Sequence, residues 1–135
     1  MQTVTADSNI YLSAIMFGGR PLQFLEMAIA GEIRLVISDA ILQEILRVLR
    51  QKFRQPDDRI ARAEAYITGC TERVAPMQTL AVIREDPDDD RILECALASG
   101  SDAIVTGDQD LLRLGEYGGI KIVKVADFLQ RGRGR

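Results

Sequence analysis

The sequence predicts an α/β protein with a mostly parallel sheet that helices cover on both faces. Two observations predict this class. Short apolar runs alternate along the chain with helical segments, which is the arrangement of β–α–β crossovers. The chain has 135 residues, of which 47% are hydrophobic, so it is long and apolar enough for one domain with a sizeable core.

In the first half of the chain, residues with known boundary preferences separate the predicted elements. Residues 7–9 (Asp-Ser-Asn) and 38–39 (Ser-Asp) are of the types that cap helix N-termini. Glycines at 18–19 and at 31 end two helices. The predicted elements are, in order, a strand over residues 3–6, helices over 10–17 and 22–30, a strand over 34–37, and helices over 40–55 and 56–68.

The second half begins with a less regular stretch, residues 69–84, in which we predict a short strand near residues 80–82. Asp86 is suited to cap the next helix, with Pro87 at its first position. The remaining predicted elements are a helix over residues 88–98, a strand over 103–106, a short helix over 110–114, a strand over 120–125 and a terminal helix from 127. We assign residues 1–130 to a single domain, and residues 131–135, which are polar and rich in glycine, to a flexible basic tail.

The composition excludes several kinds of chemistry. The chain contains no histidine, which removes serine triads and the commonest zinc and iron sites. Its net charge of -3 gives no bulk attraction to nucleic acid, so such a partner would need a local basic patch or a metal. Cys70 and Cys95 form no CxxC motif and are predicted to be reduced. No stretch approaches the ~18 apolar residues of a membrane span, and we expect a cytoplasmic protein.

Carboxylates gather where predicted strands give way to helices. Asp7 follows the first strand, Asp108 follows the strand over 103–106, and Glu44 lies on the helix after the second strand. Asp89 falls on the apolar stripe of its own helix, which turns it inward, whereas its neighbours Asp88 and Asp90 are assigned to a cap and a solvated face. Sites in parallel sheets form beyond the carboxyl ends of the strands. Each acid taken singly also has a structural explanation, as a helix cap or a solvated residue.

If these carboxylates meet, they need a compensating charge. Two of them ~4 Å apart repel by roughly 4 kcal/mol at an effective dielectric constant of 20. With no histidine to neutralise them, Mg²⁺ or Mn²⁺ is the natural partner, because carboxylate oxygens suit hard divalent cations. Such a site would bind phosphate oxygens and activate a water for attack on phosphorus. A receiver-like phosphoswitch is an alternative, although it expects adjacent acids after the first strand, where Ser8 follows Asp7.

A group of basic residues runs along the third predicted helix and into the fourth. Two interpretations are open: a solvated helix face balanced by Asp57 and Glu64, or an edge that contacts nucleic-acid phosphates beside the acidic site. The residues are Arg47, Arg50, Lys52, Arg54, Arg59 and Arg62, and the first four are our candidate contacts to nucleic acid.

These features together resemble the PIN domain, and most of all the bacterial PIN proteins described as toxin components of toxin–antitoxin pairs (VapC-like ribonucleases). The resemblance rests on an ordered set of motifs that covers nearly the whole chain. They are Val-Thr-Ala-Asp-Ser-Asn over residues 4–9, Gly-Gly-Arg-Pro over 18–21, Ile-Ser over 37–38 followed by Glu44, Asp-Pro-Asp-Asp over 86–89, and Val-Thr-Gly-Asp-Gln-Asp-Leu-Leu over 105–112. The departure is Ser8, where the family often has Thr.

The resemblance implies a three-layer α/β/α fold and a Mg²⁺- or Mn²⁺-dependent ribonuclease. It also implies a single-stranded RNA substrate, a cognate antitoxin and frequent homodimerisation. By matching position, the four catalytic and metal-binding acids are Asp7, Glu44, Asp89 and Asp108. Asn9, Thr106 and Asp110 match accessory positions. A PIN-like module that binds RNA or protein without cutting is the alternative.

Overall fold

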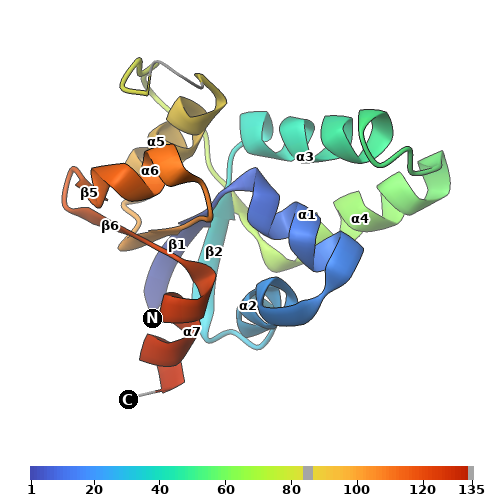
Figure 1. The fold of residues 1–135 in the computed structure, drawn as a ribbon, viewed down its shortest axis with the longest axis horizontal. Coiled ribbons are helices and arrows are strands. Elements are labelled where there is room, and N and C mark those ends of the chain that lie inside the picture. The colour runs from blue at the N-terminus through green and yellow to red at the C-terminus, as the bar shows by residue number, and fades with distance from the viewer. Residues whose placement is uncertain (84–86, 134–135) are drawn as a thin grey trace.

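The computed structural model describes residues 1–83 and 87–133, and a sheet of six strands forms its centre (Figure 1). The strands are β1 (Gln2–Ala6), β2 (Ile33–Ile37), β3 (Glu72–Arg73), β4 (Ala103–Val105), β5 (Glu116–Tyr117) and β6 (Ile120–Val123). Their order across the sheet is β3-β2-β1-β4-β6-β5, and every pair is parallel except β5 with β6. The predicted α/β class with a mostly parallel sheet is therefore confirmed.

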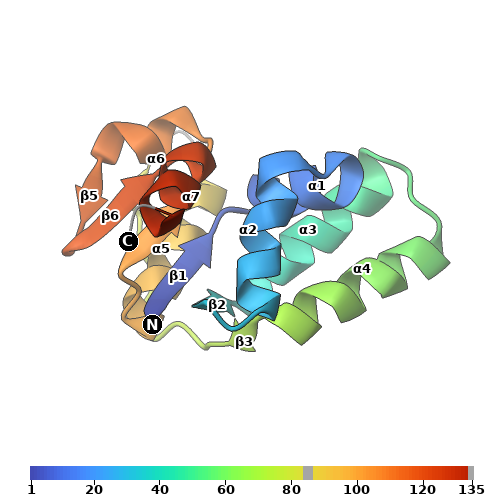
Figure 2. The same ribbon diagram turned by 90° about the horizontal axis from the view of Figure 1, so that it is seen from below.

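Helices connect the strands and cover both faces of the sheet. They are α1 (Ser8–Phe17), α2 (Gly19–Ile29), α3 (Asp39–Gln51), α4 (Asp57–Cys70), α5 (Pro87–Ser99), α6 (Gln109–Leu114) and α7 (Val125–Arg133). The chain crosses from β1 to β2 in one direction and from β3 to β4 in the other. Because such crossovers are right-handed, the two connections lie on opposite faces. Helix α5 packs on β1, β2 and β4, whereas α2 packs on β2 and α7, and Figure 2 shows α2 and α5 on opposite sides of the strands.

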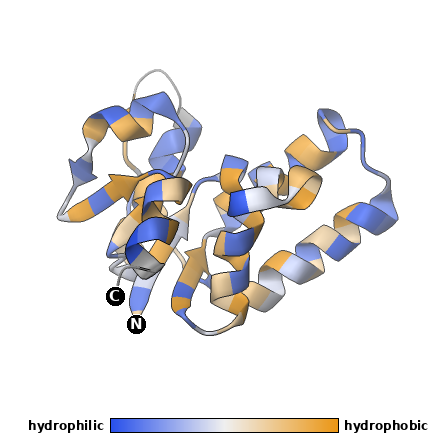
Figure 3. Ribbon diagram, turned by 60° about the horizontal axis from the view of Figure 1, so that its bottom comes forward, coloured by the Kyte–Doolittle hydropathy of each residue, from blue (hydrophilic) through white to orange (hydrophobic). Residues whose placement is uncertain are grey.

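The core lies on both sides of β1, β2 and β4, whose central residues are buried. Tyr11 and Phe24 fill one side, and Leu93 on α5 fills the other. The helices carry hydrophilic and hydrophobic residues in alternation (Figure 3), which is typical of helices that cover a sheet with one face. No helix among residues 1–83 and 87–133 is long and apolar enough to cross a membrane.

Local signals explain most of the helix boundaries. The Asp7 side chain accepts a hydrogen bond from the Asn9 backbone N–H (2.8 Å) and caps α1. Ser38 caps α3 in the same way, through the Ile41 N–H (3.3 Å). Gly18 adopts φ +75° and separates α1 from α2. This left-handed conformation costs little for a residue without a Cβ atom.

Several elements differ from the prediction, and two of the differences are informative. Helix α3 ends at Gln51 rather than at residue 55, because the chain turns at Arg54, which has φ +51°. The predicted strand near residues 80–82 is wrong. Residues 79–83 are described and form no strand, and the short strand β3 lies earlier, at Glu72–Arg73, where it pairs with β2.

Part of the predicted flexible basic tail is helical. Helix α7 continues through residues 131–133, which belong to the predicted flexible basic tail. Residues 134 and 135 of that tail lie outside the described residues, as does the predicted cap Asp86. Cys70 and Cys95 are both free thiols, as expected, and Cys95 is buried.

Candidate metal centre

Asp7 lies at the carboxyl end of β1, where its carboxylate is held from two sides. Its backbone N–H donates to the Val105 carbonyl (3.0 Å), so the pairing of β1 with β4 continues to this residue. One carboxylate oxygen accepts from the Asn9 N–H, and the other accepts from the Thr106 hydroxyl. The side chain is 4% exposed. Asn9 therefore supports Asp7 through its backbone, while its own side chain is exposed.

Thr106 joins the ends of β1 and β4. Its hydroxyl donates to the Asp7 carboxylate and accepts from the Asp108 backbone N–H (3.0 Å). Asp108 in turn caps α6, because its Oδ1 accepts from the N–H groups of Asp110 (2.8 Å) and Leu111 (3.2 Å). One fully buried hydroxyl thus ties together two of the predicted acids.

Three carboxylates meet beside this bridge. One ligand atom from each of Asp89, Asp108 and Asp110 lies within 4.8 Å of the others. Asp89 is buried on the first turn of α5, as its place on the helix stripe predicted, and the other two are half-buried. Asp110 also pairs with Arg113 one turn later (3.1 Å). The donor set consists of carboxylate oxygens, which fits a hard divalent cation.

Glu44 reaches the Asp7 side of the site from α3. Its Oε2 accepts a hydrogen bond from the Ser8 hydroxyl (2.6 Å), so Ser8 stands between the two acids. Burial raises the pKa of Glu44, and the negative charges of Asp88 and Asp7 raise it further, although the Ser8 hydrogen bond opposes them. Glu44 therefore shares an electrostatic environment with Asp7. The contact of Ser8 with Glu44 was not predicted from the sequence, and the available signal was the position of Ser8 directly after a predicted site acid.

The three consecutive aspartates on α5 have different environments. Asp88 is exposed, with its side chain 56% accessible, and lies 4.0 Å from the Arg47 guanidinium. Asp89 faces the acidic cluster. The prediction of a solvated face is wrong for Asp90, which is 2% exposed and accepts hydrogen bonds from the backbone of residues 82 and 83.

The predicted RNA contacts are not all near the acids. Arg47 follows Glu44 by one turn and approaches Asp88. Arg50 pairs with Asp57 (2.6 Å), which is the balancing acid of the solvated-face interpretation. Lys52 lies 6.0 Å from the centre of the Phe53 ring, and Arg54 is exposed in the turn after α3. Of these four residues, Arg47 contacts α5, the helix that carries Asp89.

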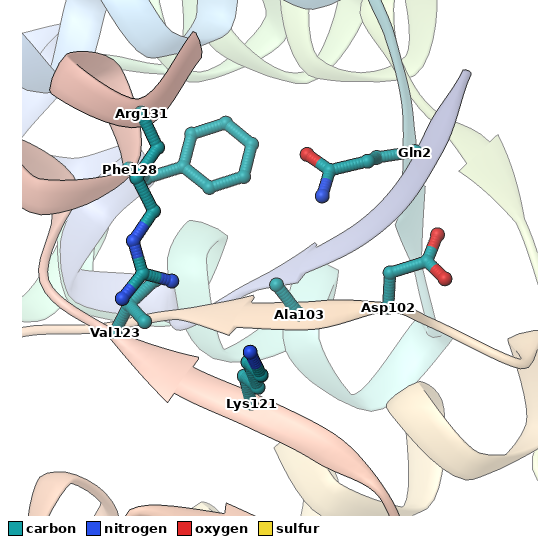
Figure 4. A pocket seen from close by; sticks show the side chains of 7 residues that line it. All are labelled: Gln2, Asp102, Ala103, Lys121, Val123, Phe128 and Arg131. Carbon is teal, nitrogen blue, oxygen red and sulfur yellow. The ribbon is translucent and has the colours of Figure 1, made fainter. Parts of the chain in front are cut away.

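A separate pocket of about 140 Å³ lies between the starts of strands β1 and β4 and helix α7 (Figure 4). Gln2 and Asp102 line it at the starts of β1 and β4, together with Lys121 on β6 and Phe128 and Arg131 on α7. None of the predicted site residues lines this pocket. The predicted acids therefore belong to the carboxyl ends of β1 and β4 or to the helices beside them, as the rule for parallel sheets requires.

The fold and the acidic edge define a class of protein, the α/β domains with a mostly parallel sheet and carboxylates beyond the carboxyl ends of its strands. The chain belongs to the PIN domain family, whose model matches residues 3–110. The resemblance noted in the sequence is therefore confirmed. A comparison with curated protein sequences finds no match.

Solved structures show the same fold. PAE2754 from Pyrobaculum aerophilum is 16% identical with a TM-score of 0.68, and the match covers 99% of this chain and 91% of that one. A chain of VapBC-1 from nontypeable Haemophilus influenzae is 13% identical with a TM-score of 0.65, covering 92% and 98%. A chain of VapBC2 from Rickettsia felis, in a complex bound to a DNA fragment from its promoter, is 15% identical with a TM-score of 0.63, covering 89% and 96%.

Proposed function

We propose that this protein is a metal-dependent endoribonuclease in which Asp7, Glu44, Asp89 and Asp108 are the catalytic and metal-binding acids. The observation that carries the proposal is the convergence of carboxylates at one edge of the sheet, with Asp89, Asp108 and Asp110 within 4.8 Å of one another. PIN family membership supports the same conclusion. Mg²⁺ or Mn²⁺ is the proposed cofactor, because all the donors are carboxylate oxygens.

The residues of the acidic site have distinct roles in this proposal. Asp7, Glu44, Asp89 and Asp108 would hold the cation, with Asp110 as an accessory ligand. A bound divalent cation would supply positive charge next to the scissile phosphate and would lower the pKa of a water molecule. Thr106 orients Asp7, and Ser8 orients Glu44.

The substrate in this proposal is single-stranded RNA. The chain carries a net charge of -3, so long-range attraction does not bring RNA to the acids, and local cations must bind the phosphates. Arg47 is the best-placed candidate, because it lies one turn from Glu44 and contacts Asp88. Arg50, Lys52 and Arg54 would extend the contact along the end of α3.

We also propose that the protein is the toxin of a toxin–antitoxin pair and forms a homodimer in the cytoplasm. Support comes from the structural similarity to chains of the VapBC2 and VapBC-1 complexes. Expression of the chain alone should slow bacterial growth, and co-expression with the product of the neighbouring gene should restore it. Growth that is unaffected in both cases would contradict the toxin role.

The nuclease itself is tested with purified protein and single-stranded RNA in the presence of Mg²⁺ or Mn²⁺. Cleavage should require the metal and should be lost in Asp7→Asn, because Asp7 is buried at the centre of the site. Asp58→Asn is the matched control, since Asp58 is an exposed acid on α4. Cleavage by Asp7→Asn or in excess chelator would overturn the proposal. Tight RNA binding without metal-dependent turnover would instead support the non-catalytic alternative.

A further inference from the structure

Two buried carboxylates on α5 bind the backbone of a segment that has no strand partner. We call residues 80–83 the strap. Glu94 Oε2 accepts from the Leu80 N–H (2.7 Å). Asp90 Oδ1 accepts from the N–H groups of Val82 and Ile83, both at 2.9 Å. Asp90 is 2% exposed and Glu94 is 6% exposed, so both acceptor carboxylates are largely shielded from water.

A third α5 side chain completes the attachment. The Arg91 guanidinium donates to the Leu80 carbonyl (3.1 Å) and pairs with Glu94 (2.8 Å). Leu80 is therefore held through both its N–H and its carbonyl group. The side chains of residues 90, 91 and 94 satisfy strap groups that a neighbouring strand would otherwise satisfy. The strap is thus fastened to the first two turns of the helix that carries Asp89.

The attachment constrains the direction of Asp89. Consecutive residues of a helix differ by roughly 100° in direction, so fixing the side chain of Asp90 fixes the rotation of the first helical turn. Asp89 then faces Asp108 and Asp110, while Asp90 faces the strap. A helix N-terminus frays readily because its first N–H groups have no partner within the helix. The hydrogen bonds between Asp90 and the strap hold this turn in place, and with it the carboxylate of Asp89.

We infer that Asp90 and Glu94 are positioning residues for Asp89, and that they set the metal affinity of the acidic cluster through the strap. The inference rests on the proposed function, in which Asp89 is a metal ligand. Neither residue belongs to the cluster itself. Residues that orient metal ligands from outside typically change metal affinity by about 10–100-fold when they are removed.

The test is Mn²⁺ binding by the full chain, measured by calorimetry without RNA. Asp90→Ala and Glu94→Ala remove the acceptors, and each should weaken Mn²⁺ binding at least about tenfold. Asp90→Asn and Glu94→Gln remove the charge but keep a carbonyl oxygen acceptor, and each should retain the native affinity within about twofold. Glu64→Ala, which removes an exposed acid on α4, is the control for the change in net charge. Near-ultraviolet circular dichroism of each variant reports the fold.

The outcomes separate the inference from the proposed function. Native affinity in both alanine variants would overturn the positioning role and leave the nuclease proposal intact. An affinity loss in Asp90→Asn as large as in Asp90→Ala would also overturn it, because charge and not hydrogen bonding would then be the cause. If the alanine variants do not fold, a loss of Mn²⁺ affinity of about tenfold or more in Asp90→Asn or Glu94→Gln would still overturn the inference. A native chain that binds no Mn²⁺ would overturn both proposals.

Discussion

Replacing Thr106 by valine tests whether one buried hydroxyl joins the two strand ends of the site. Valine has the same branched shape, so the packing at the end of β4 is kept. The change removes the donor to the Asp7 carboxylate and the acceptor of the Asp108 N–H (3.0 Å). Thr106 is fully buried, so water cannot take the place of the hydroxyl.

The size of the effect follows from these two bonds. A hydrogen bond to a charged group contributes about 1.5–3 kcal/mol and a neutral one about 0.5–1.5 kcal/mol. Thr106→Val should therefore lower the free energy of unfolding by about 2–4 kcal/mol, a large fraction of the stability of a small domain. The Asp7 carboxylate keeps its bond from Asn9, which limits the loss.

Urea unfolding in the presence of a chelator measures this change without any contribution from bound metal. Thr68→Val is the matched control, because Thr68 is exposed on α4 and its hydroxyl donates to the carbonyls of Glu64 and Ala65 on its own helix. The control should change the free energy of unfolding by no more than about 0.5 kcal/mol. A Thr106→Val variant as stable as this control would refute the bridging role of the hydroxyl.

Three further predictions concern protonation, thiol reactivity and backbone conformation. Burial is the main cause that raises the pKa of Glu44, so the folded chain binds the Glu44 proton more tightly than the unfolded chain does. The contribution of Glu44 to stability is therefore lost as the pH rises from the ordinary pKa of a glutamate through the raised pKa of the folded chain. The free energy of unfolding, measured with urea, should fall less between about pH 4 and about pH 7 in Glu44→Gln than in the native chain. Equal falls in the two proteins would contradict the raised pKa of Glu44. Burial raises the pKa of Cys95 to about 11, so iodoacetamide at about pH 8 should label it, by peptide mass mapping, only after denaturation, and native labelling would disprove this. Gly118→Ala should lower the free energy of unfolding by about 1 kcal/mol, because Gly118 has φ +58° and the new Cβ would meet Leu97 at 3.1 Å. Gly69→Ala, in open space on α4, should not lower it.

Much of the site follows from local patterns. Asp7 and Asp108 were predicted from their places after apolar strands, and each also caps the helix that follows. Asp89 was predicted to face inward from the helical period, and it does. A residue's own element sets these directions, so the sequence near it is sufficient. The assignment of catalytic roles to these acids stays a prediction until cleavage is measured.

The errors arose where a contact between two elements decided the outcome. The short apolar run at residues 80–82 has the composition of a strand, but a strand needs a neighbouring strand to bind its backbone. Here side chains of α5 bind that backbone, and the sequence pattern does not indicate this. The same contact explains Asp90, which was placed on a solvated face because the strap that covers it was not foreseen.

The sequence by itself determined the fold class, the family and the acids at the strand ends. It did so because alternation of strands with helices, capping residues and helical period are short-range properties. Only the tertiary structure decided that Ser8 bonds Glu44 and that the Thr106 hydroxyl bridges Asp7 to Asp108. Thr106 and Asp7 are 99 positions apart, and Ser8 and Glu44 are 36 apart. Whether such residues meet depends on how whole elements pack, and no local pattern in either segment encodes that distance.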